Sequence, residues 1–264
     1  MVNLLKADFF RILKTKLVYI SLIIAVLLPL LLSGMLAGLM ALLGSDDPEL
    51  GTMLTDSLNC EYLIKTTFST SQNFGIAVPV FTVIIVMADI SSGTVRNKII
   101  YGYKRHEIYA SHFITSFTYC LILMIVYSLM TAVWGVIILG GFDIDASVLM
   151  HYVYFYTLGL LGLATLVSLA CCLCLSLLNT AGSIIITVVI TIFVGFIISL
   201  LPMLEAYGVK DFVVHILRFL PNYVISAYQE IKPMMFLEGL GGIALFSGGL
   251  YALGSFIFSK RDFK

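Results

Sequence analysis

Long stretches of this chain contain no charged residue, and their lengths indicate its architecture. A bilayer core about 30 Å thick is crossed by about 20 apolar residues in a helix. The apolar stretches predict six spans, at about residues 17–43, 74–88, 113–142, 152–178, 183–201 and 236–258. The fourth and fifth share a run of 53 uncharged residues, which is too long for one crossing and which we expect to turn at Asn179 to Gly182.

The predicted fold class is all-α, a polytopic membrane protein whose residues 1–264 form a single transmembrane domain. Hydrophobic residues make up 60% of the chain and charged residues 11%, whereas an ordinary soluble domain has about 25% charged residues. A closed β-barrel would need alternating strands of about ten residues in place of these long apolar runs. The first run, about 28 residues, also exceeds the apolar core of a secretory signal, so we expect it to be retained as a span.

Charge placement predicts the orientation. Fifteen Lys and Arg balance fifteen Asp and Glu, so the net charge of zero does not favour nucleic-acid binding. On the predicted topology, eleven of the basic residues and only four of the acids fall on the side that receives both termini. Lys and Arg concentrate in cytoplasmic loops, so both termini are predicted to be cytoplasmic. The external side then holds an acidic loop at 45–65 and a longer one at 205–235, with an amphipathic helix that ends at Pro221.

The N-terminal segment, residues 1–16, is amphipathic at helical spacing. One face carries Val2, Leu5, Phe9, Ile12 and Leu13, and the other carries Asp8, Arg11, Lys14 and Thr15. This pattern is typical of a helix that lies in the membrane interface with its basic side toward the headgroups. The alternative is a simple basic anchor for the first span.

The loop from Asp89 to His112 is the longest cytoplasmic segment between spans. Val95 and Ile99, four residues apart, predict a short helix with one apolar face. Basic residues surround it, namely Arg96, Lys98, Lys104 and Arg105. The loop is either a docking surface for a cytoplasmic partner or an ordinary basic loop that fixes topology.

The sequence contains no complete set of residues for most kinds of catalytic or ion-conducting site. We expect no ionisable side chain inside any of the spans, with Asp89 and His112 only at boundaries, which disfavours a proton-coupled carrier. His106-Glu107 begins a zinc-protease motif, but Ala110 stands where the second histidine is needed. No nucleophile elbow and no phosphate-binding loop occur, so any ATP would be hydrolysed by another chain.

Small residues within the spans suggest helix packing. Cys171, Cys172 and Cys174 form either a soft-metal site or ordinary packing residues, and packing is favoured because they point in different helical directions. Gly34 with Gly38, and Gly248 with Ala252, are spaced for close helix contacts, in this chain or with a neighbour.

The loop after the second span resembles that of the ABC-2 family of ABC transporter permeases, the six-helix membrane subunits of bacterial exporters. Two segments carry the resemblance, Asp89-Ile90-Ser91-Ser92-Gly93-Thr94-Val95-Arg96 and Gly102-Tyr103-Lys104-Arg105-His106-Glu107-Ile108-Tyr109. The N-terminal helix, the six-span plan and the long outer segment before the sixth span extend it over nearly the whole chain. The Lys-Arg-x-x-Ile spacing is most similar to the subgroup that exports antimicrobial peptides or confers immunity to them.

The resemblance implies that Ser91 to Tyr101 form a coupling helix seated in a cytoplasmic ATPase subunit. The implied coupling residues are Asp89, Gly93, Thr94, Val95, Arg96, Lys98, Ile99, Lys104 and Arg105. Among them Gly93 would permit a tight turn, Thr94 would cap the following turn and Arg96 would pair with a carboxylate of the ATPase. The resemblance further implies two permease chains and two ATPase chains per transporter, in a bacterial plasma membrane, with ATP and Mg²⁺ bound only by the ATPase.

The main hypothesis is an ATP-driven export permease that is not itself an enzyme. It would move an amphipathic peptide or a hydrophobic small molecule between the spans of two copies, identical or homologous. The sequence identifies neither the substrate nor the residues that bind it. The alternative is a non-transporting membrane scaffold or sensor that recruits a partner through the same basic loop. An intramembrane enzyme is a third hypothesis, without a candidate nucleophile or base.

Overall fold

The computed structural model describes residues 1–264 apart from 47–59, 69–73, 141–145, 207–232 and 262–264. The described residues form helices α1 (Val2–Leu13), α2 (Lys16–Asp46), α4 (Cys60–Thr66), α5 (Phe74–Ser91), α6 (Thr94–Ile100), α7 (Arg105–Leu139), α8 (Ala146–Leu177), α9 (Thr180–Ala206) and α12 (Pro233–Lys260). These described segments contain no strand, so the predicted all-α class is confirmed.

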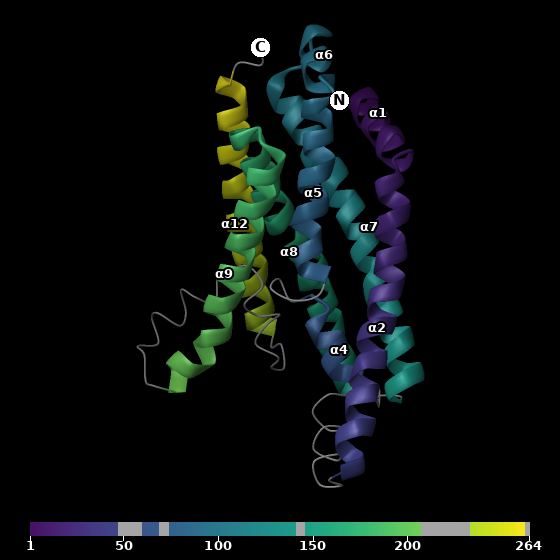
Figure 1. The fold of residues 1–264 in the computed structure, drawn as a ribbon. Coiled ribbons are helices and arrows are strands. Elements are labelled where there is room, and N and C mark those ends of the chain that lie inside the picture. The colour runs from purple at the N-terminus through teal and green to yellow at the C-terminus, as the bar shows by residue number, and fades with distance from the viewer. Residues whose placement is uncertain (47–59, 69–73, 141–145, 207–232, 262–264) are drawn as a thin grey trace.

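The long helices run up and down one elongated bundle (Figure 1). Five of them are long and apolar enough to cross a membrane, and the count rises to six if the bent pair α5 and α6 is taken as one span. By length and composition, these helices are therefore compatible with a multi-pass membrane protein. Helix α1 and the C-terminal end of α12 lie at the same end of the bundle, as an even number of crossings requires (Figure 1).

Helix α8 lies at the centre of the bundle and packs against α5, α7, α9 and α12, while α2 lies along α7. Leu158, Val167 and Leu175 of α8 are fully buried. By contrast, α2 and α9 expose rows of large apolar side chains, among them Leu31 and Phe193. Apolar side chains on the outside and packed helices within are the arrangement that a lipid environment favours.

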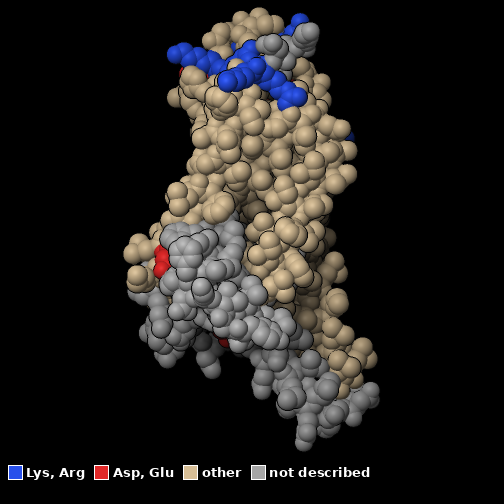
Figure 2. All heavy atoms as spheres, turned by 90° about the vertical axis from the view of Figure 1, so that its left-hand side faces the viewer, with Lys and Arg blue, Asp and Glu red and all other residues tan. Residues whose placement is uncertain are grey.

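Lysine and arginine side chains gather at one end of the bundle, which we call the basic end. Figure 2 shows them there above a long surface without charge. The basic end comprises α1, α6, the start of α7 and the end of α12 (Figure 1). The predicted separation of basic residues toward the side of the termini therefore holds for the described part of the chain.

Helix α7 begins eight residues before the predicted third span, at Arg105 and not at 113, and it ends at Leu139 and not at 142. The early start has a local cause. The carboxylate of Glu107 accepts a hydrogen bond from the backbone N–H of Lys104, at 3.2 Å, which satisfies one unpaired donor at the helix N-terminus. Consequently His112, predicted at a span boundary, is the eighth residue of a helix.

The turn predicted near Asn179 is confirmed. Helix α8 ends at Leu177, Leu178 takes a left-handed conformation with φ of 52°, and α9 starts at Thr180. The side-chain oxygen of Asn179 accepts a hydrogen bond from the N–H of Gly182 at 3.4 Å. Asparagine is among the best residues at such a helix start, which is why the long uncharged run turns here.

The segment predicted as an acidic external loop at 45–65 is partly helical. Residues Cys60–Thr66 form α4, which packs against α7. Cys60 is buried beside Gly135, whose lack of a side chain leaves room for its sulfur atom. The predicted amphipathic helix before Pro221 lies outside the described residues.

The N-terminal helix exists, but its inward face differs from the prediction. Leu4, Asp8 and Ile12 are its buried residues, whereas Val2 and Leu13, predicted on the apolar face, are exposed. Helix α1 packs against α7. The buried stripe at every fourth residue therefore contains a charged side chain, which needs a partner within the protein.

The small-residue pairs predicted to make close helix contacts are open. A Cβ atom built on Gly34, Gly38 or Gly248 would meet no atom within 4 Å. These faces of α2 and α12 thus have no closely packed neighbour among the described residues.

Candidate functional site

Helix α6 projects from the basic end and is set at an angle to α5. The two axes differ by 59°, and the bend falls at the residues between them. Gly93 precedes α6 with φ of 71°, and Gly102 follows it with φ of 87°. Both angles lie in the left-handed region that favours glycine. The expected tight turn at Gly93 is therefore present, and the two glycines bound the short helix.

The predicted cap of this helix is wrong. Gly93 itself occupies the position before the first turn, and no side chain caps the helix. Thr94 is the first helical residue, and its hydroxyl pairs with that of Ser92 at 2.7 Å. The backbone conformation available to glycine, and not a threonine cap, explains where α6 starts.

Helix α6 has sharply different faces. Val95 and Lys98 point inward and are buried. Arg96 is exposed on the opposite face, Ile100 is 72% exposed, and Tyr101, which directly follows the helix, is 83% exposed. The outward surface thus carries one cation, Arg96, and two large side chains, Ile100 and Tyr101. Such large side chains are rarely exposed on a surface that lies outside the apolar part of the bundle.

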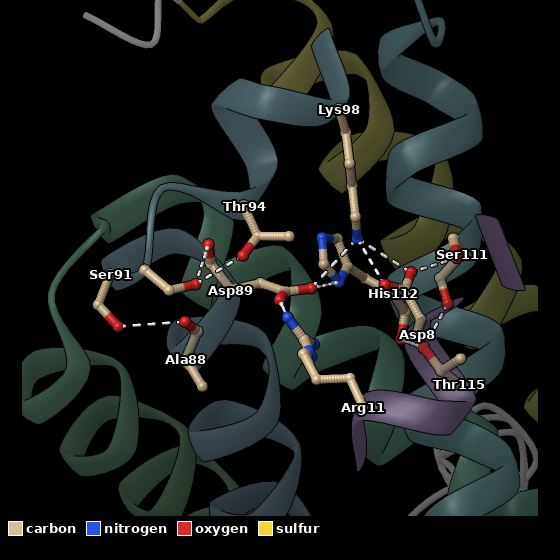
Figure 3. A network of polar contacts seen from close by, with 11 residues as sticks. Asp8, Arg11, Ala88, Asp89, Ser91, Thr94, Lys98, Ser111, His112 and Thr115 are labelled. Carbon is tan, nitrogen blue, oxygen red and sulfur yellow. Dashed lines mark hydrogen bonds and ion pairs between the residues drawn. The ribbon is translucent and has the colours of Figure 1, made fainter. Parts of the chain in front are cut away.

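Lys98 reaches down from α6 into a buried group of charges (Figure 3). Its Nζ donates hydrogen bonds to Asp8 Oδ1 at 2.7 Å, Asp8 Oδ2 at 3.0 Å and Asp89 Oδ2 at 3.2 Å. The side chains of Lys98 and Asp8 are 9% and 4% exposed, and that of Asp89 is fully buried. One ammonium therefore joins α6 to both α1 and α5.

Three further residues complete this group, which we call the ion cluster. Arg11 of α1 forms an ion pair with Asp89. His112 Nδ1 lies 3.3 Å from Asp89 Oδ2, and the hydroxyl of Ser111 donates to Asp8 Oδ2 at 2.6 Å. The ion cluster consists of Asp8, Arg11, Asp89, Lys98, Ser111 and His112, and it joins α1, α5, α6 and α7 (Figure 3).

The ion cluster balances two carboxylates against two cations. Burial lowers the pKa of Lys98 below its ordinary value, and the hydrogen bonds that Lys98 donates to Asp8 oppose this shift. Burial also lowers the pKa of Arg11, again against the charge of Asp8. Buried charges are tolerated only when they are paired, so removal of one member leaves another uncompensated.

The ion cluster also contains a possible set of metal ligands. Asp8, Asp89 and His112 each offer one ligand atom, and these atoms lie within 4.8 Å of one another. Carboxylate oxygen and imidazole nitrogen suit several divalent ions. The Lys98 ammonium bonds to both carboxylates, however, so it takes the cation's position. A metal ion could bind here only if Lys98 moved away.

A second polar junction joins other helices at the basic end. Arg105 at the start of α7 donates to the carbonyl oxygen of Ser259 at 2.9 Å and to that of Arg261. Arg261 in turn donates to the carbonyl oxygen of Leu175 at 3.1 Å and to that of Ser176. These guanidinium groups satisfy carbonyl groups at the ends of α8 and α12. Helix α7 thus links the ion cluster to the rest of the bundle.

The nine predicted coupling residues do not share one surface. Asp89, Val95 and Lys98 are buried inside the chain, and Gly93, Thr94, Ile99 and Arg105 are half-buried. Arg96 and Lys104 are exposed. Lys98, predicted to face a partner, is instead an internal cation. The exposed residues that can meet another protein are fewer than predicted, and they include Ile100 and Tyr101, which the prediction left out of the coupling set.

Sequence reasoning missed four residues of the ion cluster as site residues, namely Asp8, Arg11, Ser111 and His112. Asp8 follows Leu4 and precedes Ile12 at intervals of four, which was a signal that the acid faces inward. His112 also lies deeper than predicted. The prediction that no ionisable side chain lies inside a span is wrong, because Glu238 of the predicted sixth span lies in the second turn of α12. The three clustered cysteines of α8 form no group of three metal ligands in the described part of the chain.

Comparison of the sequence with protein-family models gives no match, and comparison with curated proteins gives none. The resemblance to ABC-2 permeases therefore stays a prediction, carried by the residues around Gly93.

Proposed function

We propose that this chain is the membrane-spanning permease subunit of an ATP-driven exporter, and that its outward α6 surface binds a separate cytoplasmic ATPase. The observation that carries the proposal is the construction of α6. A short helix stands at an angle on the end of a membrane bundle, with exposed Ile100 and Tyr101 on its outside. Apolar side chains in such a position gain stability when a protein partner covers them.

The ion cluster supports a mechanical role for this helix. A push on α6 reaches α5 through the short turn at Gly93, and it reaches α1 and α7 through Lys98, Asp8 and Ser111. Paired and buried charges hold one geometry, because separating them leaves unpaired charge in a low-dielectric interior. In the proposal, ATPase closure moves α6, and the ion cluster passes the movement to α1, α5 and α7 together.

The same proposal fixes the orientation and the assembly. The basic end is cytoplasmic, in accord with the usual excess of Lys and Arg on that side, so both termini are cytoplasmic in a bacterial plasma membrane. The open faces at Gly34 and Gly248 support a second copy or a homologous permease in the complex, since small residues allow close helix contacts. ATP and Mg²⁺ belong to the ATPase, and this chain is not an enzyme.

The proposed cargo is an amphipathic peptide or a hydrophobic small molecule, because the described helices present mainly apolar and hydroxyl side chains. Buried Ser183, Thr187 and Thr191 line one face of α9 at every fourth residue. The last two hydroxyls donate to backbone carbonyl oxygens one turn before them, at 2.5 and 2.8 Å. These hydroxyls thus add no charge to the bundle.

The direct test is co-purification of this chain with an ABC ATPase from the cells that produce it. Ile100→Gln should weaken binding of that ATPase by at least about tenfold, because a buried isoleucine contributes roughly 1.5–3 kcal/mol. Val2→Gln is the matched control, since Val2 is 66% exposed on α1 and is not part of α6. If an ATPase binds equally to both variants, the α6 surface is not its docking site.

A scaffold or sensor would use the same surface without ATP turnover. Stimulation of ATP hydrolysis by this chain in reconstituted vesicles separates the two functions, because only the exporter requires it. Binding without stimulation would favour the scaffold.

A further inference from the structure

Residues 60–68 connect two long helices toward the end of the bundle that lies opposite to the basic end (Figure 1). They comprise α4 and the turn that follows it. Cys60 packs on Gly135 of α7, where a Cβ atom would lie only 2.7 Å from its sulfur. Phe68 packs on Gly159 of α8. We call residues 60–68 the latch, because their two ends contact two different helices of the bundle.

The contact of the latch with α8 is specific in its geometry. A Cβ atom built on Gly159 would overlap the ring of Phe68, so the ring occupies the space that glycine leaves. The same ring meets Phe155 and Tyr156 edge to face, with centroids 5.5 and 5.3 Å apart. Aromatic rings favour this arrangement over others. Phe68 therefore fits α8 at one position along that helix.

The latch is attached to the bundle by apolar side chains. Leu63, Ile64 and Phe68 are each at most 5% exposed. Thr66 and Thr67 are also buried, but both hydroxyls donate to the carbonyl oxygen of Leu63 at 3.0 Å, so their burial is compensated within the latch itself. A helix of seven residues has little stability of its own, and short peripheral segments open at a lower free energy than core helices do. The latch can therefore detach without any break in a long helix.

Helix α7 links the latch to the ion cluster. Ser111 and Gly135 lie on this one continuous helix, roughly 36 Å apart at 1.5 Å per residue. Because the latch contacts α7 through Cys60 and α8 through Phe68, both contacts are complete only at one position of α7 against α8. A movement of α7 along its axis or around it would break one of them.

We propose that the latch opens locally while the rest of the bundle stays folded, and that its opening frees α7 to move against α8. The opening itself is a property of this chain alone. Its use in export rests on the proposed function, in which ATPase closure moves α7 through α6 and the ion cluster. The latch is then the contact that must open when this movement reaches the far end of α7.

The native cysteines provide the first test. The chain has five cysteines, all free, and Cys60 is the one that lies outside α7 and α8. Cys60, Cys120 and Cys171 are each at most 2% exposed, so burial alone predicts equally slow reactions with a thiol reagent. In the folded, purified full-length chain, mass spectrometry should show that Cys60 reacts at least about a hundredfold faster than the other two, because only Cys60 is reached by local opening. Equal rates would overturn the proposal.

A glycine substitution shows whether Phe68 controls the opening. Gly159→Ala displaces the ring and should raise the reaction rate of Cys60 about tenfold, with no change at Cys120. Gly248→Ala is the matched control, because a Cβ atom on Gly248 meets no atom within 4 Å, and it should change neither rate. An unchanged rate at Cys60 in Gly159→Ala would overturn the proposal. So would an equal rise at Cys60 and Cys120, since Phe68 would then stabilise the whole bundle and not a local latch.

A disulfide tests whether export needs the opening. A Cβ atom built on Gly135 lies 3.6 Å from the Cβ of Cys60, within the range of disulfides. In Gly135→Cys, oxidation should bond the introduced thiol to Cys60 and fix the latch to α7, while Phe68 fixes it to α8. The oxidised variant should not stimulate an ATPase that co-purifies with the chain, and dithiothreitol should restore stimulation.

The outcomes separate the latch from the proposed function. Full stimulation by the crosslinked Gly135→Cys chain would overturn the role of the latch in export. If the oxidised and reduced wild-type chains also fail to stimulate the ATPase, the proposed function is wrong, and the cysteine reaction rates still decide whether the latch opens.

Discussion

Removal of the Lys98 side chain should destabilise the protein far more than its place on a short, solvent-facing helix implies. In Lys98→Ala, Asp8 loses both of its ammonium contacts, at 2.7 and 3.0 Å, and keeps the hydroxyl of Ser111. Asp89 loses one contact but retains Arg11. The structural consequence is one buried carboxylate without a counter-ion.

The size of the effect follows from burial. The side chains of Lys98 and Asp8 are 9% and 4% exposed, so water screens their interaction little. Loss of one partner from a buried ion pair costs about 3–5 kcal/mol. For a chain of this size each kcal/mol corresponds to roughly 2–4 °C, so the apparent melting temperature should fall by at least about 6 °C. Arg96→Ala, on the exposed face of the same helix, should change stability by less than about 0.5 kcal/mol.

A thiol-reactive fluorescent dye can follow this unfolding, because Cys120, Cys171 and Cys174 are free and buried in the folded bundle. Heating exposes them to the dye. The double variant Asp8→Asn with Lys98→Ala removes the orphaned charge and should recover a good part of the loss, a coupling that neighbouring sites show. A melting temperature for Lys98→Ala equal to that of Arg96→Ala would refute the ion cluster as a structural element.

Three further outcomes follow from particular contacts. Zn²⁺ should raise the melting temperature of Lys98→Ala but not of the wild type, since the departed ammonium frees the ligands of the ion cluster; no rise in the variant would contradict this reading. Arg261→Ala should lower the free energy of unfolding by about 1.5–3 kcal/mol, because carbonyl groups of α8 lose a charged hydrogen-bond donor. Lys260→Ala, at an exposed position, is its control in the same melting assay. Gly135→Ala places a Cβ 2.7 Å from the Cys60 sulfur and should lower the free energy of unfolding by about 1–3 kcal/mol. The double variant with Cys60→Ala should regain that stability.

The membrane helices were predictable because their signal is local. A run of about 20 uncharged apolar residues has few alternatives to a spanning helix, and Asn179 marks its turn by a favourable helix start. The start of α7 was missed because the stabilising contact is the Glu107 cap, which extends a helix into residues that are basic and polar. Hydropathy identifies the apolar part of a helix, and it does not identify a polar part of the same helix that continues beyond the membrane.

The ion cluster could not be read from the sequence in the same way. Asp8 and Lys98 are 90 residues apart, and nothing in either segment identifies the other as its partner. Lys98 was assigned to a docking surface because basic residues near membranes are usually exposed. The spacing of Leu4, Asp8 and Ile12 indicates that Asp8 faces inward, but only the structure shows that Lys98 turns toward it.

The measurement that tests the central claim most directly is ATP hydrolysis by an ABC ATPase that co-purifies with this chain, in vesicles with and without the chain. Our account predicts that the wild-type chain stimulates hydrolysis, and that Ile100→Gln abolishes the stimulation while its melting temperature matches that of Val2→Gln. Equal hydrolysis with the wild-type chain, with Ile100→Gln and with empty vesicles would contradict the proposal that α6 couples an ATPase to this membrane bundle.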